Sequence, residues 1–152
     1  MVRKAKTSDV RTVQKILGHF ASRGRLLNRS LSDLYTHVRD IFVFEDPDNH
    51  WVVGCGCLSV VWEDLAEIRS LAVLDFYQGG GIGALLVRSC LEEARRLDLR
   101  RVFVLTYETD FFEHMGFARV DKSVLPHKIW ADCLNCTKFP DCDEVAMMLE
   151  LR

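Results

Sequence analysis

A glycine-rich segment, Gln78-Gly79-Gly80-Gly81-Ile82-Gly83, separates two stretches of different periodicity. The apolar run at 68–74 before it is typical of a buried strand, and the stretch 82–97 after it repeats apolar residues at helical three- and four-residue steps. Glycines between a strand and a helix let the backbone approach a ligand closely. They also direct free N–H groups, with the positive end of the helix dipole, at an anion. The segment therefore predicts a site for a phosphate or pyrophosphate group.

The residues of this loop exclude one class of phosphate-binding site and leave two other interpretations to compare. It lacks the Gly-Lys-Ser/Thr ending of a nucleotide-triphosphate loop, which excludes that class. Gly79-x-Gly81-x-x-Ala84 does match the dinucleotide-binding fingerprint, with Glu108 at the end of the next apolar run. That fingerprint is expected in a doubly wound domain, whereas here hairpins precede the strand. A purely structural turn is the remaining alternative, although four glycines within 79–83 exceed what a tight turn needs.

The pattern Gln78-x-x-Gly81-x-Gly83 also resembles the acetyl-CoA motif Gln/Arg-x-x-Gly-x-Gly/Ala of the GNAT acetyltransferases. Residues 71–78 are similar to that family's strand and loop, with Asp75 where proline is common, and 111–117 are similar to its FYEKxGF segment. The resemblance covers most of the second half of the chain. It implies an α/β (α+β) fold in which residues 1–152 form a single GNAT domain. The implied sheet is mixed and mostly antiparallel, with about seven strands, splayed central strands and about four covering helices.

Periodicity and capping residues predict where these elements lie. Strands are expected at 2–6, 41–45, 51–62, 67–74, 101–105, 117–120 and 145–151. Helices are expected from Thr7-Ser8-Asp9 to about Ser22, from Ser30 or Ser32 to Arg39, at 82–97 and at 109–114. In the family that the chain resembles, the pantetheine arm of the coenzyme lies where the strands here at 67–74 and 101–105 splay apart.

Length and composition set further bounds. At 152 residues the chain can bury a single core, and its net charge of -2 provides no electrostatic reason to expect nucleic acid or an anionic membrane as a partner. No apolar run approaches the ~20 residues that span a bilayer, and residues 1–10 are polar, unlike a signal peptide. A cytoplasmic location is therefore expected, where the six cysteines stay mostly reduced. A homodimer is left open.

The resemblance implies acetyl-CoA as the co-substrate. The expected coenzyme contacts are Leu71, Ala72, Val73, Gln78, Gly79, Gly80, Gly81, Ile82, Gly83, Ala84 and Phe112. Acetyl transfer to an amine also needs a base and a hydrogen-bond donor for the carbonyl oxygen. The family provides the donor from a backbone N–H, here of Leu71 or Val73, and often uses a carboxylate acting through water as the base. Glu67 matches that carboxylate, with Glu63 as a second candidate. The alternative is that both acids solvate a strand end.

The proton donor for the departing thiolate is less evident. The family often uses a tyrosine in its FYEKxGF segment, but Phe112 stands at that position. Tyr107 is the nearest substitute, unless its ring is packed and its hydroxyl solvated as in an ordinary strand-end tyrosine. A thiolate can also leave unaided, so a missing acid does not argue against activity.

Segments outside the loop bear on the amine acceptor. Residues 24–30 resemble the GxLLxRS segment of N-acetylglutamate synthases, 101–106 resemble their LFVLT, and 125–128 also have a counterpart there. This implies a small-molecule acceptor, L-glutamate in arginine biosynthesis, with glutamine or another amino acid left open. Carboxylates are bound by cationic side chains, and best by the planar guanidinium of arginine, which can donate two hydrogen bonds at once. The expected acceptor contacts are Arg25, Leu27, Arg29, Ser30 and Lys128.

One departure from the synthases keeps other functions open. The synthases place an arginine soon after LFVLT, whereas this chain has Tyr107-Glu108-Thr109-Asp110, an anionic stretch that would repel a dicarboxylate or attract an ammonium group. One alternative is acetylation of another amine, such as a polyamine or a protein N-terminus. Another is a non-catalytic domain that binds acyl-CoA as a sensor.

The tail contains Cys133-x-x-Cys136-x5-Cys142, a spacing that also occurs in zinc sites. A fourth ligand would have to come from His127, Cys55 or Cys57, and a redox-active pair is a further alternative. We favour packing, with small thiols in a compact loop over the acceptor site and no metal. Cys55 and Cys57 alternate along a strand, so both thiols should face one side and pack there.

Overall fold

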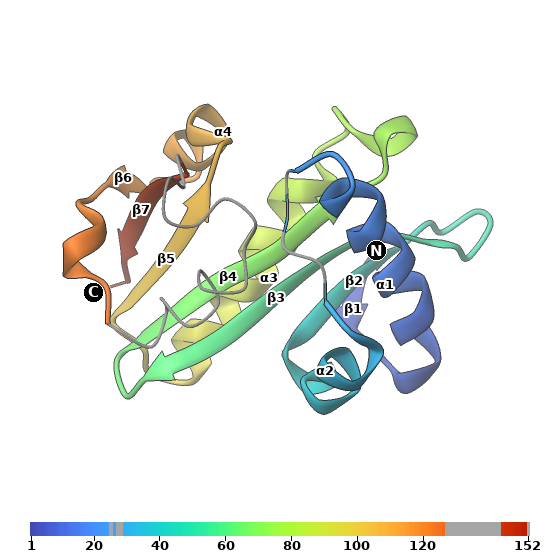
Figure 1. Cartoon of the computed structure of the whole chain (residues 1–152), viewed down its shortest axis with the longest axis horizontal. Helices are drawn as coiled ribbons and strands as arrows, with labels where there is room; N and C mark the ends of the chain where they lie inside the picture. The colour runs from blue at the N-terminus through green and yellow to red at the C-terminus, as the bar shows by residue number, and fades with distance from the viewer. Residues whose placement is uncertain (25, 27–28, 127–143, 152) are drawn as a thin grey trace.

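The computed structural model describes residues 1–24, 26, 29–126 and 144–151, and its centre is one seven-stranded sheet of order β1-β2-β3-β4-β5-β7-β6 (Figure 1). The strands are β1 (Val2–Lys4), β2 (Ile41–Glu45), β3 (Val52–Trp62), β4 (Leu65–Val73), β5 (Arg101–Thr106), β6 (Ala118–Arg119) and β7 (Val145–Glu150). The α-helices are α1 (Val10–Ala21), α2 (Leu31–Thr36), α3 (Ile82–Arg96) and α4 (Thr109–His114). Single 3-10 turns lie at Thr7–Asp9, Val38–Asp40, Asp75–Tyr77 and Lys122–Val124. The predicted fold class is confirmed.

The central strands splay as predicted. All neighbouring strands are antiparallel except β4 and β5, which are parallel and pair only at Leu65, Ala66 and Glu67 of β4. The register of β4 with β5 ends at Glu67, although β4 continues to Val73. Figure 1 shows the two strands diverging from that point.

Helices cover both faces of the sheet. Apolar residues of α3, among them Leu86 and Val87, pack with Ile68 of β4 in one core cluster. On the other face, α1 and α2 pack against a second cluster that includes Cys55 and Cys57, so the two thiols do face one side. Among the described helices, none has both the length and the apolar character that a bilayer-spanning segment requires.

Two glycines of β3 let α3 approach the sheet. A Cβ at Gly54 would lie 3.3 Å from both the Ala72 carbonyl oxygen and Cδ1 of Leu86, and a Cβ at Gly56 would lie 3.2 Å from Cδ1 of Leu71. These distances are at the tight limit of real contacts. Any side chain at Gly54 would therefore crowd the interface between β3 and α3.

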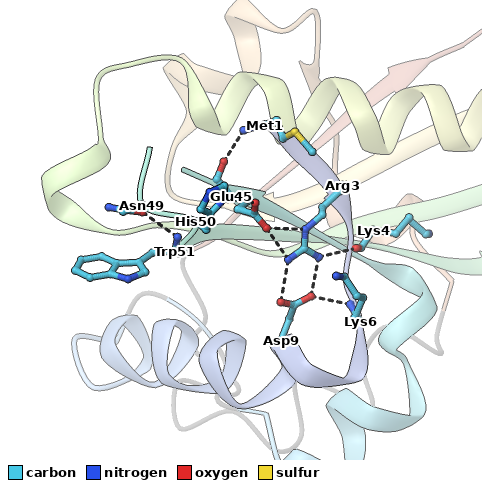
Figure 2. A network of polar contacts seen from close by, with 9 residues as sticks. All are labelled: Met1, Arg3, Lys4, Lys6, Asp9, Glu45, Asn49, His50 and Trp51. Carbon is cyan, nitrogen blue, oxygen red and sulfur yellow. Dashed lines mark hydrogen bonds and ion pairs between the residues drawn. The ribbon is translucent and has the colours of Figure 1, made fainter. Parts of the chain in front are cut away.

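A polar network joins the start of the chain to α1 and β2 (Figure 2). The guanidinium of Arg3 donates to both Asp9 carboxylate oxygens, at 2.8 and 3.0 Å, and to Glu45 Oε1 at 3.1 Å. Asp9 also accepts from the backbone N–H of Lys6 at 2.7 Å, which turns the chain into the helix. This turn explains why β1 ends at Lys4 and not at the predicted residue 6.

Candidate active site

The glycine loop lies between the end of β4 and the start of α3. Gly79 and Gly81 both have φ of 87°, a conformation that favours glycine, and Gly81 is the N-cap of α3. Apart from chain neighbours, no described atom lies within 4 Å of a Cβ built at either glycine. The first N–H groups of a helix also have no carbonyl partner within the helix. The loop therefore offers open space and free donors to an anion, as a pyrophosphate requires.

Gln78 fixes the start of this loop. Its side-chain Nε2 donates to the carbonyl oxygen of Val73 at 2.9 Å and to Oδ1 of Asp75 at 3.3 Å. The amide thereby ties the loop back to the last residue of β4. These two hydrogen bonds therefore fix the conformation at the start of the loop.

The first turn of α3 leans on α4. A Cβ at Gly83 would lie 3.5 Å from the ring of Phe111, so this glycine gives room to an aromatic neighbour. Phe112, expected at the coenzyme, is only 2% exposed and packs edge-on against the ring of Phe117. Its burial supports a role in the core and not a contact with a ligand. Ile82 is likewise buried, whereas Ala84 is half-buried.

A β-bulge interrupts β4 at Ser70. Cys57 is opposite Arg69 and Cys55 is opposite Ala72, so one strand uses two steps where the other uses three. Ser70 has φ of 56°, which is unusual for a residue with a side chain. Because of the extra residue, Leu71 packs towards α3 while Ala72 packs towards α1. The backbone of Leu71, the predicted hydrogen-bond donor to the acetyl oxygen, therefore lies just beyond the bulge and beside the splay.

The structure separates the two candidate bases. Glu67 is 9% exposed and is the last β4 residue that pairs with β5, so it stands where the strands begin to diverge. Glu63 lies in the exposed turn between β3 and β4. Only Glu67 is thus at the splay.

Tyr107 follows the last residue of β5, on the other arm of the splay. It is 37% exposed, and the next residue is fixed by a hydrogen bond from the Glu108 N–H to Oγ1 of Thr106 at 2.8 Å. The position is compatible with proton donation to a group held between the strands.

A charged cavity opens on the α1 and α2 side of β3 and β4. Its walls include Leu17 of α1, Asp33 of α2 and His37 at the C-cap of α2, and its floor includes Arg69 and Ser70. The cavity therefore adjoins the bulge at Ser70 and, at Ser59, the cross-strand partner of Glu67.

Arg29 also lines this cavity. Its side chain is 12% exposed, and its Nη1 lies 3.8 Å from Oδ2 of Asp33. Ser30, expected both as a possible cap of the second helix and as an acceptor contact, caps α2, because its Oγ accepts from the Asp33 N–H at 3.1 Å. Arg25, Leu27 and Lys128 lie outside the described residues. Arg69 was missed by the sequence analysis, although its two-residue spacing from Glu67 is the pattern that could have found it.

Burial and nearby charged residues both affect the pKa of the Cys57 thiol. Burial raises the pKa of its thiol to about 12, with Asp40 and Glu67 adding to the rise and Arg69 and Arg29 opposing it. Three of these charged residues, Asp40, Arg29 and Arg69, also line the cavity. Burial raises the pKa of Cys55 to about 12 as well, so both thiols are neutral at physiological pH and neither is an activated nucleophile.

Cys133, Cys136 and Cys142 lie outside the described residues, as does His127. Among the residues that are described, no three His, Cys, Asp or Glu side chains gather as metal ligands would.

An anion loop before a helix, two splayed strands and a charged cavity beside them together define a transferase that uses a phosphorylated acyl carrier. Residues 16–117 match the Acetyltransferase (GNAT) family, and the chain belongs to this family. It is an acetyl-CoA-dependent N-acetyltransferase.

Relatives are similar over most of the chain. An uncharacterized N-acetyltransferase of Chlorobaculum tepidum is 39% identical over 99% of this chain and 96% of its own length. An amino-acid acetyltransferase of Mycobacterium tuberculosis is 45% identical over 80% of this chain and 70% of its own.

Solved structures agree. A Mycobacterium tuberculosis protein in complex with CoA and a second ligand has a TM-score of 0.86 at 37% identity, over 100% of this chain and 99% of that one. The N-acetylglutamate synthase of Neisseria gonorrhoeae, complexed with coenzyme A and N-acetyl-glutamate, has a TM-score of 0.88 at 25% identity. This chain is fully covered there but spans only 35% of that synthase.

Proposed function

We propose that the chain transfers the acetyl group of acetyl-CoA to the α-amino group of L-glutamate, in the cytoplasm and as a step of arginine biosynthesis. The observation that carries the proposal is the cavity beside the splay. It is lined by the cations Arg29 and Arg69 and by Ser59, the cross-strand partner of the buried carboxylate Glu67. The names of the amino-acid acetyltransferase and N-acetylglutamate synthase relatives support it.

The chemistry follows from the positions of these groups. Glu67 takes a proton from the acceptor ammonium through a water molecule, which frees the amine nitrogen to attack the thioester carbonyl carbon. The backbone N–H of Leu71 stabilises the negative charge on the carbonyl oxygen. A C–N bond forms, the C–S bond breaks, and the thiolate leaves with a proton from Tyr107 or unaided. The nitrogen loses its second proton to Tyr107, which restores the phenol, or to water. The neutral thiol of Cys57 takes no part in this direct transfer.

L-glutamine is the second candidate acceptor. Glu108 and Asp110, both exposed, follow β5 where the synthases place an arginine. Such an anionic stretch disfavours a second carboxylate and tolerates an amide.

The experiment is a screen for free thiol released from acetyl-CoA. Each standard amino acid, a polyamine and a peptide with a free N-terminus are supplied as acceptors to the purified chain. L-Glutamate should give the highest kcat/KM, followed by L-glutamine. Preference for the polyamine or the peptide would contradict the proposal, and binding of acetyl-CoA without turnover of any acceptor would identify an acyl-CoA sensor.

A further inference from the structure

Two arginines, Arg29 and Arg69, line different sides of the cavity. We infer that Arg69 binds the α-carboxylate of the amino-acid acceptor beside Glu67, while Arg29 on the α2 side binds its side-chain carboxylate. The inference deepens the proposed function and rests on it. It makes Arg69 the residue that selects α-amino acids, and Arg29 the residue that selects among them.

Arg69 and Glu67 lie on one face of β4. They are two residues apart, so their side chains project to the same side at a spacing of about 7 Å. Their partners across the sheet are Cys57 and Ser59, which line the same cavity. The bulge at Ser70 follows immediately, so the order along the strand is carboxylate, guanidinium, bulge and predicted oxyanion donor.

This order of charges matches an α-amino acid. An α-amino acid carries its ammonium and α-carboxylate on the same carbon. An amine directed at Glu67 therefore brings its carboxylate towards the next residue on the same face of β4. That neighbour is Arg69, whose planar guanidinium can donate two parallel hydrogen bonds to a carboxylate. A polyamine has no carboxylate, and its second cation would meet Arg69 unfavourably.

Arg29 lies on a different wall of the cavity. It precedes the N-cap of α2, and Asp33 holds its guanidinium at 3.8 Å. Asp33 in turn lies 3.6 Å from Nε2 of His37, whose Nδ1 lies 3.5 Å from Asp40. The acids of the α2 wall are thus arranged around Arg29 and His37. Arg29, Arg69 and Cys57 all line the cavity, and both guanidinium groups oppose the rise in the pKa of the Cys57 thiol.

Three acceptors separate the two roles. L-Glutamate has both carboxylates, L-glutamine lacks the side-chain carboxylate, and L-isoglutamine has an amide in place of the α-carboxylate. The variants are Arg69→Met and Arg29→Met, and the control is Arg95→Met, an exposed arginine near the end of α3. The measurements are kcat/KM for each acceptor and KM for acetyl-CoA.

Arg69→Met should lower kcat/KM about thirtyfold for L-glutamate and L-glutamine and leave that for L-isoglutamine unchanged. Arg29→Met should lower it to a similar extent for L-glutamate and L-isoglutamine and leave that for L-glutamine unchanged. Arg95→Met should change none of the three. If Arg69→Met fails to fold, Arg69→Lys decides, because it keeps the charge without the bidentate geometry. A smaller loss confined to L-glutamate and L-glutamine is expected there.

Equal losses for all three acceptors in Arg69→Met would overturn the inference, since they would show a general role of this arginine in the site. The reverse assignment of the two arginines would overturn it too. Absence of turnover of any amino acid by the unaltered chain would overturn the proposed function itself. The two failures are therefore distinguishable.

Discussion

Gly81 adopts a backbone conformation that a residue with a side chain reaches only with strain, and it faces open space at the start of α3. Gly81→Ala adds a methyl group where the coenzyme's pyrophosphate is expected to approach. We expect affinity for acetyl-CoA, measured by calorimetry, to fall about tenfold or more, with a loss of stability of about 1 kcal/mol from the strain.

The matched control is Gly18→Ala in the middle of α1. Gly18 has no described atom within 4 Å of a built Cβ and no positive φ. This substitution should raise the free energy of unfolding by about 0.5–1 kcal/mol and leave acetyl-CoA affinity unchanged. A Gly81→Ala chain that binds acetyl-CoA as tightly as the unaltered chain would contradict the placement of the pyrophosphate.

Residues of the candidate site differed in how well their sequence context predicted them. Gly79 and Gly81 were predictable because their backbone needs are local. Ser30 was predicted both as a possible cap of the second helix and as an acceptor contact, because a serine before a helix fits either role; the structure shows the cap. Arg69 was missed although its two-residue spacing from Glu67 puts both side chains on one face of β4. Which of the two faces meets the cavity depends on packing against α1 and α2, which is not a local property.

At the level of elements, the contact between β3 and α3 depends on Gly54. A Cβ there would lie 3.3 Å from the Ala72 carbonyl and 3.4 Å from Cγ2 of Ile82, both in well-packed surroundings. Gly54→Ala should therefore lower the free energy of unfolding by about 1–3 kcal/mol, since an overpacked core must shift. Urea denaturation measures this. If Gly54→Ala changed the free energy of unfolding by no more than Gly18→Ala does, or raised it as Gly18→Ala should, the interface would be shown to accommodate the added methyl group.

Elements with strong periodicity were predicted well, and their ends less so. The helix predicted to reach Arg39 ends at Thr36, and a 3-10 turn at Val38–Asp40 continues it. The strand predicted at 117–120 is reduced to Ala118–Arg119. Both pieces are short, so hydrogen bonds to neighbouring elements determine their limits more than periodicity does.

At the scale of the whole molecule, the Arg3 network of Figure 2 connects the start of the chain to α1 and β2. The hydrogen bond from Arg3 holds the pKa of Asp9 below its usual value, against the opposing effect of burial. A lowered carboxyl pKa means that the stabilisation is present above the unfolded pKa and is lost as the pH falls through the folded one. The network should therefore weaken in acid and be fully present at neutral pH.

Arg3→Met should lower the free energy of unfolding at neutral pH by about 1–3 kcal/mol, because Asp9 is left buried without its main donor. The difference from the unaltered chain should shrink as the pH is lowered below about 4. Urea titrations at neutral and acidic pH measure both effects. Arg11→Met, on the exposed side of α1, is the control. It should change neither the free energy of unfolding at neutral pH nor its dependence on pH. A difference that stays constant with pH would assign the loss to packing alone.

The divergence of β4 from β5 has a thermodynamic consequence. Residues 68–73 of β4 gain no ladder hydrogen bonds from β5, so within the described chain the sheet is incomplete along that edge. A coenzyme that occupies the edge binds the folded chain and not the unfolded one, so by mass action its binding free energy adds to that of folding. At a free concentration of one hundred times Kd this linkage contributes about 2.7 kcal/mol. The melting temperature of this acetyltransferase is therefore a property of its coenzyme supply as well as of its sequence.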